Sequence, residues 1–262
     1  MRIWYQSSSS IGKNPTFAAY ERALIKNVTG IGRPGTTIDI HGVERMTPSL
    51  DTFKYFRFLN TKQIIDNGFR AQAEGYDAFV VGCFGDPAYF EMKGVLDIPV
   101  TFLGESALII SGLLGDTFGL IGHWRPSLAN ILRNVDQYGY RDRLAGVQSI
   151  DIKLEEVDRW FADPAPVIEK FTREAHVLLE RGAEVLIPAC GCLNQVVVES
   201  GLKTIDGAIV LDAAAAAVKV AEMLVDLARV NRQPVSRRAA FPRPSRQLLD
   251  SVRLLYGEAP LA

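Results

Sequence analysis

Short apolar runs alternate with stretches of helical periodicity along most of this chain. Several of the runs are apolar on both faces, as is typical of buried parallel strands. We therefore predict an α/β fold with parallel sheets. The predicted strands are Arg2–Gln6, Thr36–Val43, Ala78–Cys83, Val100–Leu103, Thr117–Gly122, Val147–Ile152, Val185–Ala189 and Ala208–Leu211. The predicted helices are Phe17–Asn27, Leu50–Glu74, Asp86–Lys93, Glu105–Leu114, Pro126–Tyr138, Pro164–Arg181 and Ala213–Arg229.

One internal repeat divides the chain in two. Residues 75–83 read GYDAFVVGC and residues 182–190 read GAEVLIPAC, so each copy runs from a glycine through an apolar strand to a cysteine. In both copies a further glycine, a helix and another apolar strand follow. Such self-similarity indicates a duplicated unit. We predict a first lobe of residues 1–104 with 208–262, which carries Cys83, and a second lobe of residues 105–207, which carries Cys190.

The repeat places Cys83 and Cys190 at the carboxyl tips of two predicted strands, where open parallel sheets bind ligands. A following helix, and the backbone N–H groups of Phe84, Gly85 and Gly191, would lower the pKa of each thiol. Two such sulfurs across a cleft suit racemisation, since one removes a proton from carbon and the other returns a proton to the opposite face. The same N–H groups would hold an enolate. Taken singly, a cysteine in an apolar strand is usually a small core residue.

Other polar residues at strand ends are candidate substrate-binding groups. Gln6 ends the first predicted strand, and Ser7, Ser8 and Ser9 follow it directly. For the serine run, a flexible linker is the alternative interpretation. His123 follows the strand Thr117–Gly122 and would bind substrate or orient a thiol, unless it is an ordinary loop histidine.

Cys192 lies two positions after Cys190 and competes with it for the same role. We prefer Cys190 because its offset in the repeat matches that of Cys83. A C-x-C pair without a second pair or a nearby histidine is a weak metal signal, so we predict no metal ligand. The chain has no Walker A motif and no G-x-G-x-x-G. We predict that no cofactor is needed, although motifs alone do not exclude a pyridoxal-binding lysine.

Charge and hydropathy limit the partners. A net charge of −1 gives no basic face for nucleic acid or an anionic membrane. No run is apolar and long enough for a signal peptide or a membrane span, so we predict a cytoplasmic protein. Three cysteines do not suggest a disulfide framework. The Pro- and Arg-rich tail from Asn231 is predicted to be a strap or partner contact with a short helix near Gln247–Tyr256.

Three segments carry a family likeness: VVGCFGDPAYFEMKGVLDIPVTFLGESAL, GAEVLIPACG and AIVLDAAAAAVKVAEML. They resemble the aspartate/glutamate/hydantoin racemase superfamily, with most similarity to hydantoin and allantoin racemases, roughly from Arg2 to Ala228. The resemblance implies two Rossmann-like lobes related by a pseudo-twofold axis, with the active site in the cleft between them. It also implies Cys83 and Cys190 as the acid/base pair, no metal or pyridoxal cofactor, and a homo-oligomer.

The chain departs from that family pattern at three places. Gln6-Ser7-Ser8-Ser9-Ser10 replaces an Asn-x-Asn-Thr-Ser-like loop, Gly191-Cys192-Leu193 replaces Ala-Gly-Met, and His123-Trp124 replaces small polar residues.

We predict a cofactor-independent racemase or epimerase of small molecules, acting on 5-substituted hydantoins or a related cyclic ureide such as allantoin. The alternatives are an amino-acid racemase, a maleate isomerase or an arylmalonate decarboxylase-like enzyme of the same fold. A non-enzymatic small-molecule binding protein is a further alternative. The presence of both Cys83 and Cys190 argues against decarboxylation, which needs one thiol.

Overall fold

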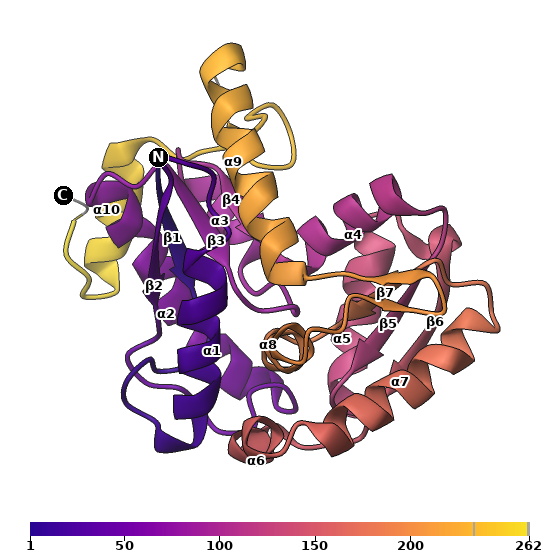
Figure 1. The fold of residues 1–262 in the computed structure, drawn as a ribbon. Coiled ribbons are helices and arrows are strands. Elements are labelled where there is room, and N and C mark those ends of the chain that lie inside the picture. The colour runs from indigo at the N-terminus through magenta and orange to yellow at the C-terminus, as the bar shows by residue number, and fades with distance from the viewer. Residues whose placement is uncertain (233, 261–262) are drawn as a thin grey trace.

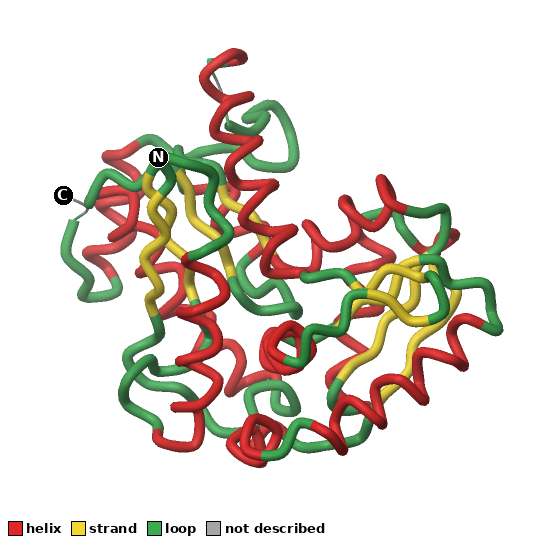
Figure 2. The backbone as a smooth tube through the Cα atoms, viewed as in Figure 1, coloured by secondary structure: helices red, strands yellow, loops and turns green. Residues whose placement is uncertain are grey.

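The computed structural model describes residues 1–232 and 234–260 and contains two separate β-sheets with helices packed around them (Figures 1 and 2). The strands are β1 (Arg2–Gln6), β2 (Thr37–His41), β3 (Ala78–Val81), β4 (Val100–Phe102), β5 (Phe118–Gly122), β6 (Leu144–Ser149), β7 (Val185–Pro188), β8 (Thr204–Ile205) and β9 (Ala208–Val210). The α-helices are α1 (Ala18–Thr29), α2 (Lys54–Ala73), α3 (Tyr89–Val95), α4 (Leu103–Leu114), α5 (Arg125–Gln137), α6 (Val157–Ala162), α7 (Ala165–Leu179), α8 (Gly191–Glu199), α9 (Ala213–Asn231) and α10 (Arg246–Leu255).

The first sheet has the strand order β2-β1-β3-β4, and every pairing in it is parallel. Alternate residues of β1 enter different cores. Ile3 and Tyr5 join the larger core, which continues into the second sheet, whereas Trp4 joins a smaller core beneath α2 and α3. Both faces of the sheet are therefore buried, as continuous apolar strands require.

The second sheet has the order β6-β5-β7-β9-β8 and is parallel except at one edge. There β8 pairs antiparallel with β9. Asp206 and Gly207 connect the two strands, and both have positive φ, as a type I′ hairpin turn requires. The prediction of an α/β fold with two lobes is confirmed, and β8 is an addition to the predicted parallel sheet.

The observed elements follow most of the predicted ranges within two or three residues. Three predicted elements begin at other residues in the structure. The predicted helix Leu50–Glu74 begins only at Lys54, the predicted helix Asp86–Lys93 begins only at Tyr89, and the predicted strand Val147–Ile152 is displaced to Leu144–Ser149. Helix α6 was not predicted.

Helix α9 connects the two sheets. It begins directly after β9, in the second sheet, and packs along β3, β4 and α4 (Figure 1). The predicted division assigned residues 208–262 to the first lobe. Because β9 hydrogen-bonds to β7 of the second sheet, the chain passes from the second sheet back to the first through α9.

The C-terminal segment packs on the first lobe. Arg237 donates to the carbonyls of Lys93 and Leu96 at the end of α3. The predicted short helix is present as α10. Residues 233 and 261–262 of the predicted tail lie outside the described part of the chain. Within the described ranges, no helix is long and apolar enough to cross a membrane.

Candidate active site

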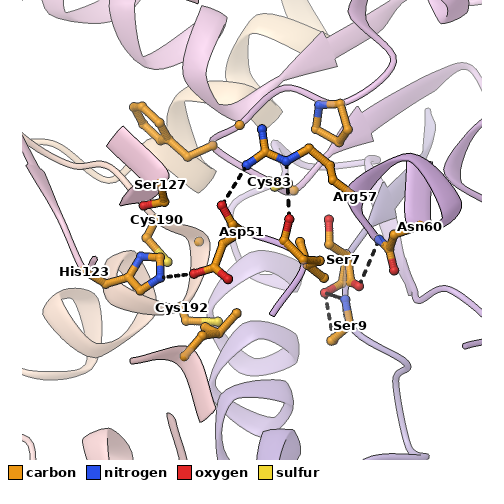
Figure 3. Close-up of a pocket in the computed structure, with 18 of the residues that line it drawn as sticks. Ser7, Ser9, Asp51, Arg57, Asn60, Cys83, His123, Ser127, Cys190 and Cys192 are labelled. Carbon is orange, nitrogen blue, oxygen red and sulfur yellow. Dashed lines mark hydrogen bonds and ion pairs between the residues drawn. The ribbon is translucent and has the colours of Figure 1, made fainter. Parts of the chain in front are cut away.

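A cavity lies between the two sheets and is lined by residues that follow β1, β3, β5 and β7 (Figure 3). It contains about 810 Å³ of space that no atom fills, part of it open to solvent. Helix α2 and the loop before it form a further wall. The carboxyl ends of parallel strands from both sheets therefore contribute to one pocket.

The structure brings nearly all of the predicted site residues into this cavity. Those that line it are Ser7, Ser8, Ser9, Cys83, Phe84, Gly85, His123, Cys190, Gly191 and Cys192. Gln6 is the exception. Its side chain is fully buried, where it accepts hydrogen bonds from the Trp4 indole and the Asn67 amide and donates to the Ser7 carbonyl. Gln6 supports the loop of Ser7, Ser8 and Ser9 (the serine loop) through its hydrogen bond to the Ser7 carbonyl, and it does not line the cavity.

Cys190 occupies the N-cap position of α8, two positions after the end of β7. A hydrogen bond from the Cys192 thiol lowers the pKa of Cys190, against the effect of burial. The positive charge of His123 and the Leu193 N–H act in the same direction. The positive end of α8 also favours an anion at this position. Cys190 is thus placed to be a thiolate.

Cys83 has a different environment, although it also lies two positions after its strand. No helix begins behind it, because Asp86 and Ala88 adopt positive φ and α3 starts at Tyr89. Burial raises the pKa of Cys83. The Gly85 N–H, the Ser8 hydroxyl and the charge of Arg57 oppose this rise only in part. The expectation that both thiols have lowered pKa values is therefore wrong for Cys83.

Asp86 explains the late start of α3. Its buried carboxylate accepts hydrogen bonds from the N–H groups of Gly104 and Glu105, at 2.8 Å each, and from the Tyr138 hydroxyl at 2.9 Å. Burial raises the pKa of Asp86 to about 7. Asp86 was expected to begin α3, but its carboxylate caps the N-terminus of α4. The loop that carries Cys83 and Asp86 is thereby held against α4.

The two cysteine loops meet at glycines. A Cβ atom added to Gly191 would lie 3.0 Å from the carbonyl oxygen of Gly82. Ordinary contacts of a Cβ begin near 3.4 Å. The glycine that follows Cys190 thus allows the two lobes to approach closely beside the thiols.

His123 is buried and ion-paired with Asp51. Its Nε2 lies 2.9 Å from Asp51 Oδ2, and its side chain is 5% exposed. Burial by itself would lower the pKa of His123, but the negative charges of Cys190 and Asp51 raise it to about 10. Both negative charges favour the protonated form of the ring, and Figure 3 shows the ring beside Cys190.

Cys192 is buried, and burial raises its pKa. Its thiol hydrogen-bonds to Cys190. A protonated Cys192 stabilises the anionic form of Cys190. The two cysteines that the sequence left as competitors for one role therefore differ, with Cys192 as the hydrogen-bond donor and Cys190 as the acceptor.

The serine loop forms the wall below Cys83. The Ser7 and Ser9 hydroxyls lie 2.9 Å apart, and the Ser9 N–H donates to the Ser7 hydroxyl. The Asn60 amide donates to the Ser8 carbonyl at 3.4 Å. The loop is therefore ordered by its own hydrogen bonds and is no flexible linker.

Three charged or amide side chains of the pocket were not predicted from the sequence: Asp51, Arg57 and Asn60. Arg57 and Asn60 lie in α2, and Asp51 precedes that helix. The predicted polar candidates lie at strand tips, and none of these three residues is at a strand tip. The Arg57 guanidinium donates to the carbonyls of Leu50 and Asp51, at 3.5 and 3.3 Å.

Among the residues that the structure describes, no three His, Cys, Asp or Glu side chains are arranged to hold a metal ion.

Comparisons with known proteins identify a matching family and several similar proteins. The Asp/Glu/hydantoin racemase family matches residues 11–221. The chain is 28% identical over 187 residues to a hydantoin racemase of Pseudomonas sp. (strain NS671), covering 71% of this chain and 73% of that protein. It is 32% identical over 171 residues to a hydantoin racemase of Paenarthrobacter aurescens, covering 64% and 70%.

Among solved structures, the fold is similar to that of allantoin racemase from Klebsiella pneumoniae. The TM-score is 0.78 at 20% identity, and the likeness covers 94% of each chain.

Proposed function

The chain belongs to the Asp/Glu/hydantoin racemase family, and on this premise we propose that it racemises a 5-substituted hydantoin or a related cyclic ureide such as allantoin. In this proposal Cys83 and Cys190 are the acid/base pair and no cofactor takes part. One observation carries the assignment. Two cysteines from the two halves of the repeat line one cavity, and their surroundings favour opposite protonation states.

Opposite protonation states suit a two-base reaction. The Cys190 thiolate removes the proton from C5 of the ring, and the electron pair of that C–H bond moves into the adjacent C4 carbonyl to give an enolate. The Cys83 thiol then delivers its proton to the other face of C5. In the reverse direction the two sulfurs exchange roles, so one site accepts both enantiomers.

The enolate needs donors close to the thiols. The N–H groups of Gly191 and Cys192 lie in the first turn of α8, where backbone N–H groups have no partner within the helix. They border the cavity at the positive end of that helix. We assign them to the developing negative charge, which such preorganised dipoles stabilise more than water does.

The rest of the cavity supports a largely neutral substrate with an apolar substituent. Apolar side chains cover much of its wall: Phe17, Met46, Leu50, Ile131 and Leu154. Asp51 is neutralised by His123, which leaves Arg57 as the cation that faces the cavity near Cys83. The Ser7, Ser9 and Asn60 groups provide hydrogen bonds for ring carbonyl and N–H groups.

Proton NMR in D2O tests the proposal. EDTA-treated protein is mixed with an enantiopure 5-alkyl hydantoin, and loss of the C5 proton signal and of optical rotation are followed together against buffer alone. We expect both to fall with the wild-type protein. Cys83→Ser and Cys190→Ser should each abolish racemisation, and each should retain slow exchange from one enantiomer only.

Cys192→Ser is the matched control, because a serine hydroxyl can still donate to Cys190. It should retain racemisation above the buffer rate. If Cys192→Ser abolishes activity while Cys190→Ser does not, the assignment of Cys190 fails. If the wild-type protein exchanges no hydantoin or allantoin proton, the substrate class is wrong, and amino acids, maleate and malonates follow in the same assay. Cytoplasmic location, homo-oligomerisation and the exact lobe division stay predictions.

A further inference from the structure

The loop of residues 42–53 extends from the first lobe across the cavity to the second. Two of its side chains contact the second lobe: Asp51, whose carboxylate pairs with His123, and Ser49, whose hydroxyl donates to Glu155 at 2.6 Å. Arg57 holds the end of the loop through the Leu50 and Asp51 carbonyls. Met46, Leu50 and Asp51 form part of the cavity wall. The loop therefore covers part of the cavity, and two polar contacts attach it to the second lobe.

One of these contacts is buried at the reactive centre. The side chains of His123 and Asp51 are 5% and 13% exposed. Nδ1 of His123 is buried without a hydrogen-bond partner, while its other nitrogen is committed to Asp51. The charged or titratable groups around the ring are Asp51 and Cys190, with Cys192, Cys83 and Arg57 on the adjoining walls.

A largely buried carboxylate such as that of Asp51 is stabilised by a positive partner, since an unpaired charge away from water is strongly unfavourable. Asp51, together with Cys190, thus favours the protonated form of His123. A protonated His123 in turn favours a negative charge on Cys190, which lies beside it in Figure 3, whereas it is not among the groups that shift the pKa of Cys83.

We propose that Asp51 and His123 form a positioning pair that keeps Cys190 as the thiolate and leaves Cys83 as the thiol whenever the 42–53 loop is closed. The catalytic consequence rests on the proposed function. The resting enzyme is then asymmetric, and Cys190 is its base. Because Asp51 belongs to the loop, closure of the loop is coupled to the ionisation of Cys190.

The asymmetry has a defined kinetic signature. The two enantiomers of a racemase substrate have equal free energies, so kcat/KM must be equal in both directions. A bias toward one protonation state therefore appears as unequal kcat values, each compensated by KM. Loss of Asp51 should make the two kcat values more nearly equal, whereas a merely structural lesion lowers both together.

The ionisation can be measured without substrate. In a Cys83→Ser, Cys192→Ser background Cys190 is the one remaining cysteine, and the serine that replaces Cys192 can still donate to it. The ultraviolet absorbance of the thiolate and the rate of alkylation by iodoacetamide are followed against pH. Asp51→Asn should move both profiles upward by about one pH unit or more, and slow alkylation at about pH 6 roughly tenfold.

Ser49→Ala is the matched control, since it removes the other contact of the same loop and leaves His123 paired. It should leave the Cys190 titration in place. The proposal is overturned if Asp51→Asn does not move the titration, or if Ser49→Ala moves it as far. If Asp51→Asn does not fold, His123→Gln carries the same expectation and the same refutation. The proposed racemisation fails independently, in the NMR assay, even where this titration behaves as expected.

Discussion

A substitution at Gly191 should show how the packing of the two lobes affects the catalytic rate. In Gly191→Ala the new Cβ would lie 3.0 Å from the Gly82 carbonyl oxygen, so the two cysteine loops must separate by a few tenths of an ångström. Displacing a catalytic group by about 1 Å can reduce the rate about a hundredfold. A few tenths therefore predict a fall in kcat of roughly three- to tenfold, with KM changed less.

The same substitution should lower stability. Overpacking by a methyl group costs about 2 kcal/mol at the middle of its usual range, and the gain of alanine over glycine in a helix offsets about 1 kcal/mol of this cost. The net loss of about 1 kcal/mol should lower the Tm by roughly 2–4 °C. Polarimetry on a 5-alkyl hydantoin and thermal unfolding followed by circular dichroism measure the two effects.

Gly85 offers a matched control, since it is the first glycine after the cysteine in the other copy of the repeat. A Cβ there would meet no atom closer than 3.7 Å. Gly85→Ala should therefore leave the Tm close to that of the wild type. A Gly191→Ala protein with wild-type Tm and kcat, or a Gly85→Ala protein that is equally destabilised, would refute the packing argument.

Two further outcomes are expected. Asp212 caps α9 through the N–H groups of Ala214 and Ala215, at 2.9 and 3.1 Å, so Asp212→Ala should lower stability by about 1–2 kcal/mol in thermal unfolding. Asp226→Ala on the exposed surface of the same helix should cost less, and equal losses would contradict the capping role. The second outcome concerns pH. The raised pKa of His123 gives stability that is full below its ordinary value of 6.5 and is lost as pH rises through about 10. The lowered pKa of Cys190 gives stability that is full above its ordinary value of 9.0 and is lost as pH falls through the folded value. Between 6.5 and 9.0 the native pair (one imidazolium, one thiolate) and the unfolded pair (one imidazole, one thiol) bind equal numbers of protons, so the contribution is constant there and declines on both sides. The Tm difference between wild type and His123→Asn should follow this plateau across pH, and a difference that rises or falls steadily would contradict it.

The paired strands and cysteines could be predicted from the sequence for a physical reason. Strands buried on both faces are continuous apolar runs. Both β3 and β7 end two residues before their cysteine, as the repeat indicates. The alternation of elements indicated the fold class in the same way, because each buried strand needs a covering helix.

Other features depend on contacts that are distant in sequence. Asp51 was assigned to the first turn of the predicted helix Leu50–Glu74, whereas the loop continues to Phe53 and the carboxylate pairs with His123, a residue of the other lobe. Asp86 was expected to begin a helix, but its carboxylate caps α4 instead. Local periodicity carries no information on either contact.

One miss was avoidable. Asp206-Gly207 lies between two short apolar segments and is a strong sequence signal for a two-residue hairpin. The strand β8 could have been predicted from it. The opposite pKa shifts of Cys83 and Cys190 could not be predicted from the sequence, because they depend on where the following helix begins.

Helix α9 makes the two halves inseparable. Its capping residue Asp212 accepts a hydrogen bond from Asn194 of α8, while Thr101 of β4 donates to the Ala217 carbonyl within α9. Further along, Glu222 accepts from the Arg33 N–H, beside the first sheet. Because these bonds join α9 to both halves of the repeat, we expect the chain to unfold in one cooperative transition, so that a destabilising substitution in one half also lowers the stability of the other.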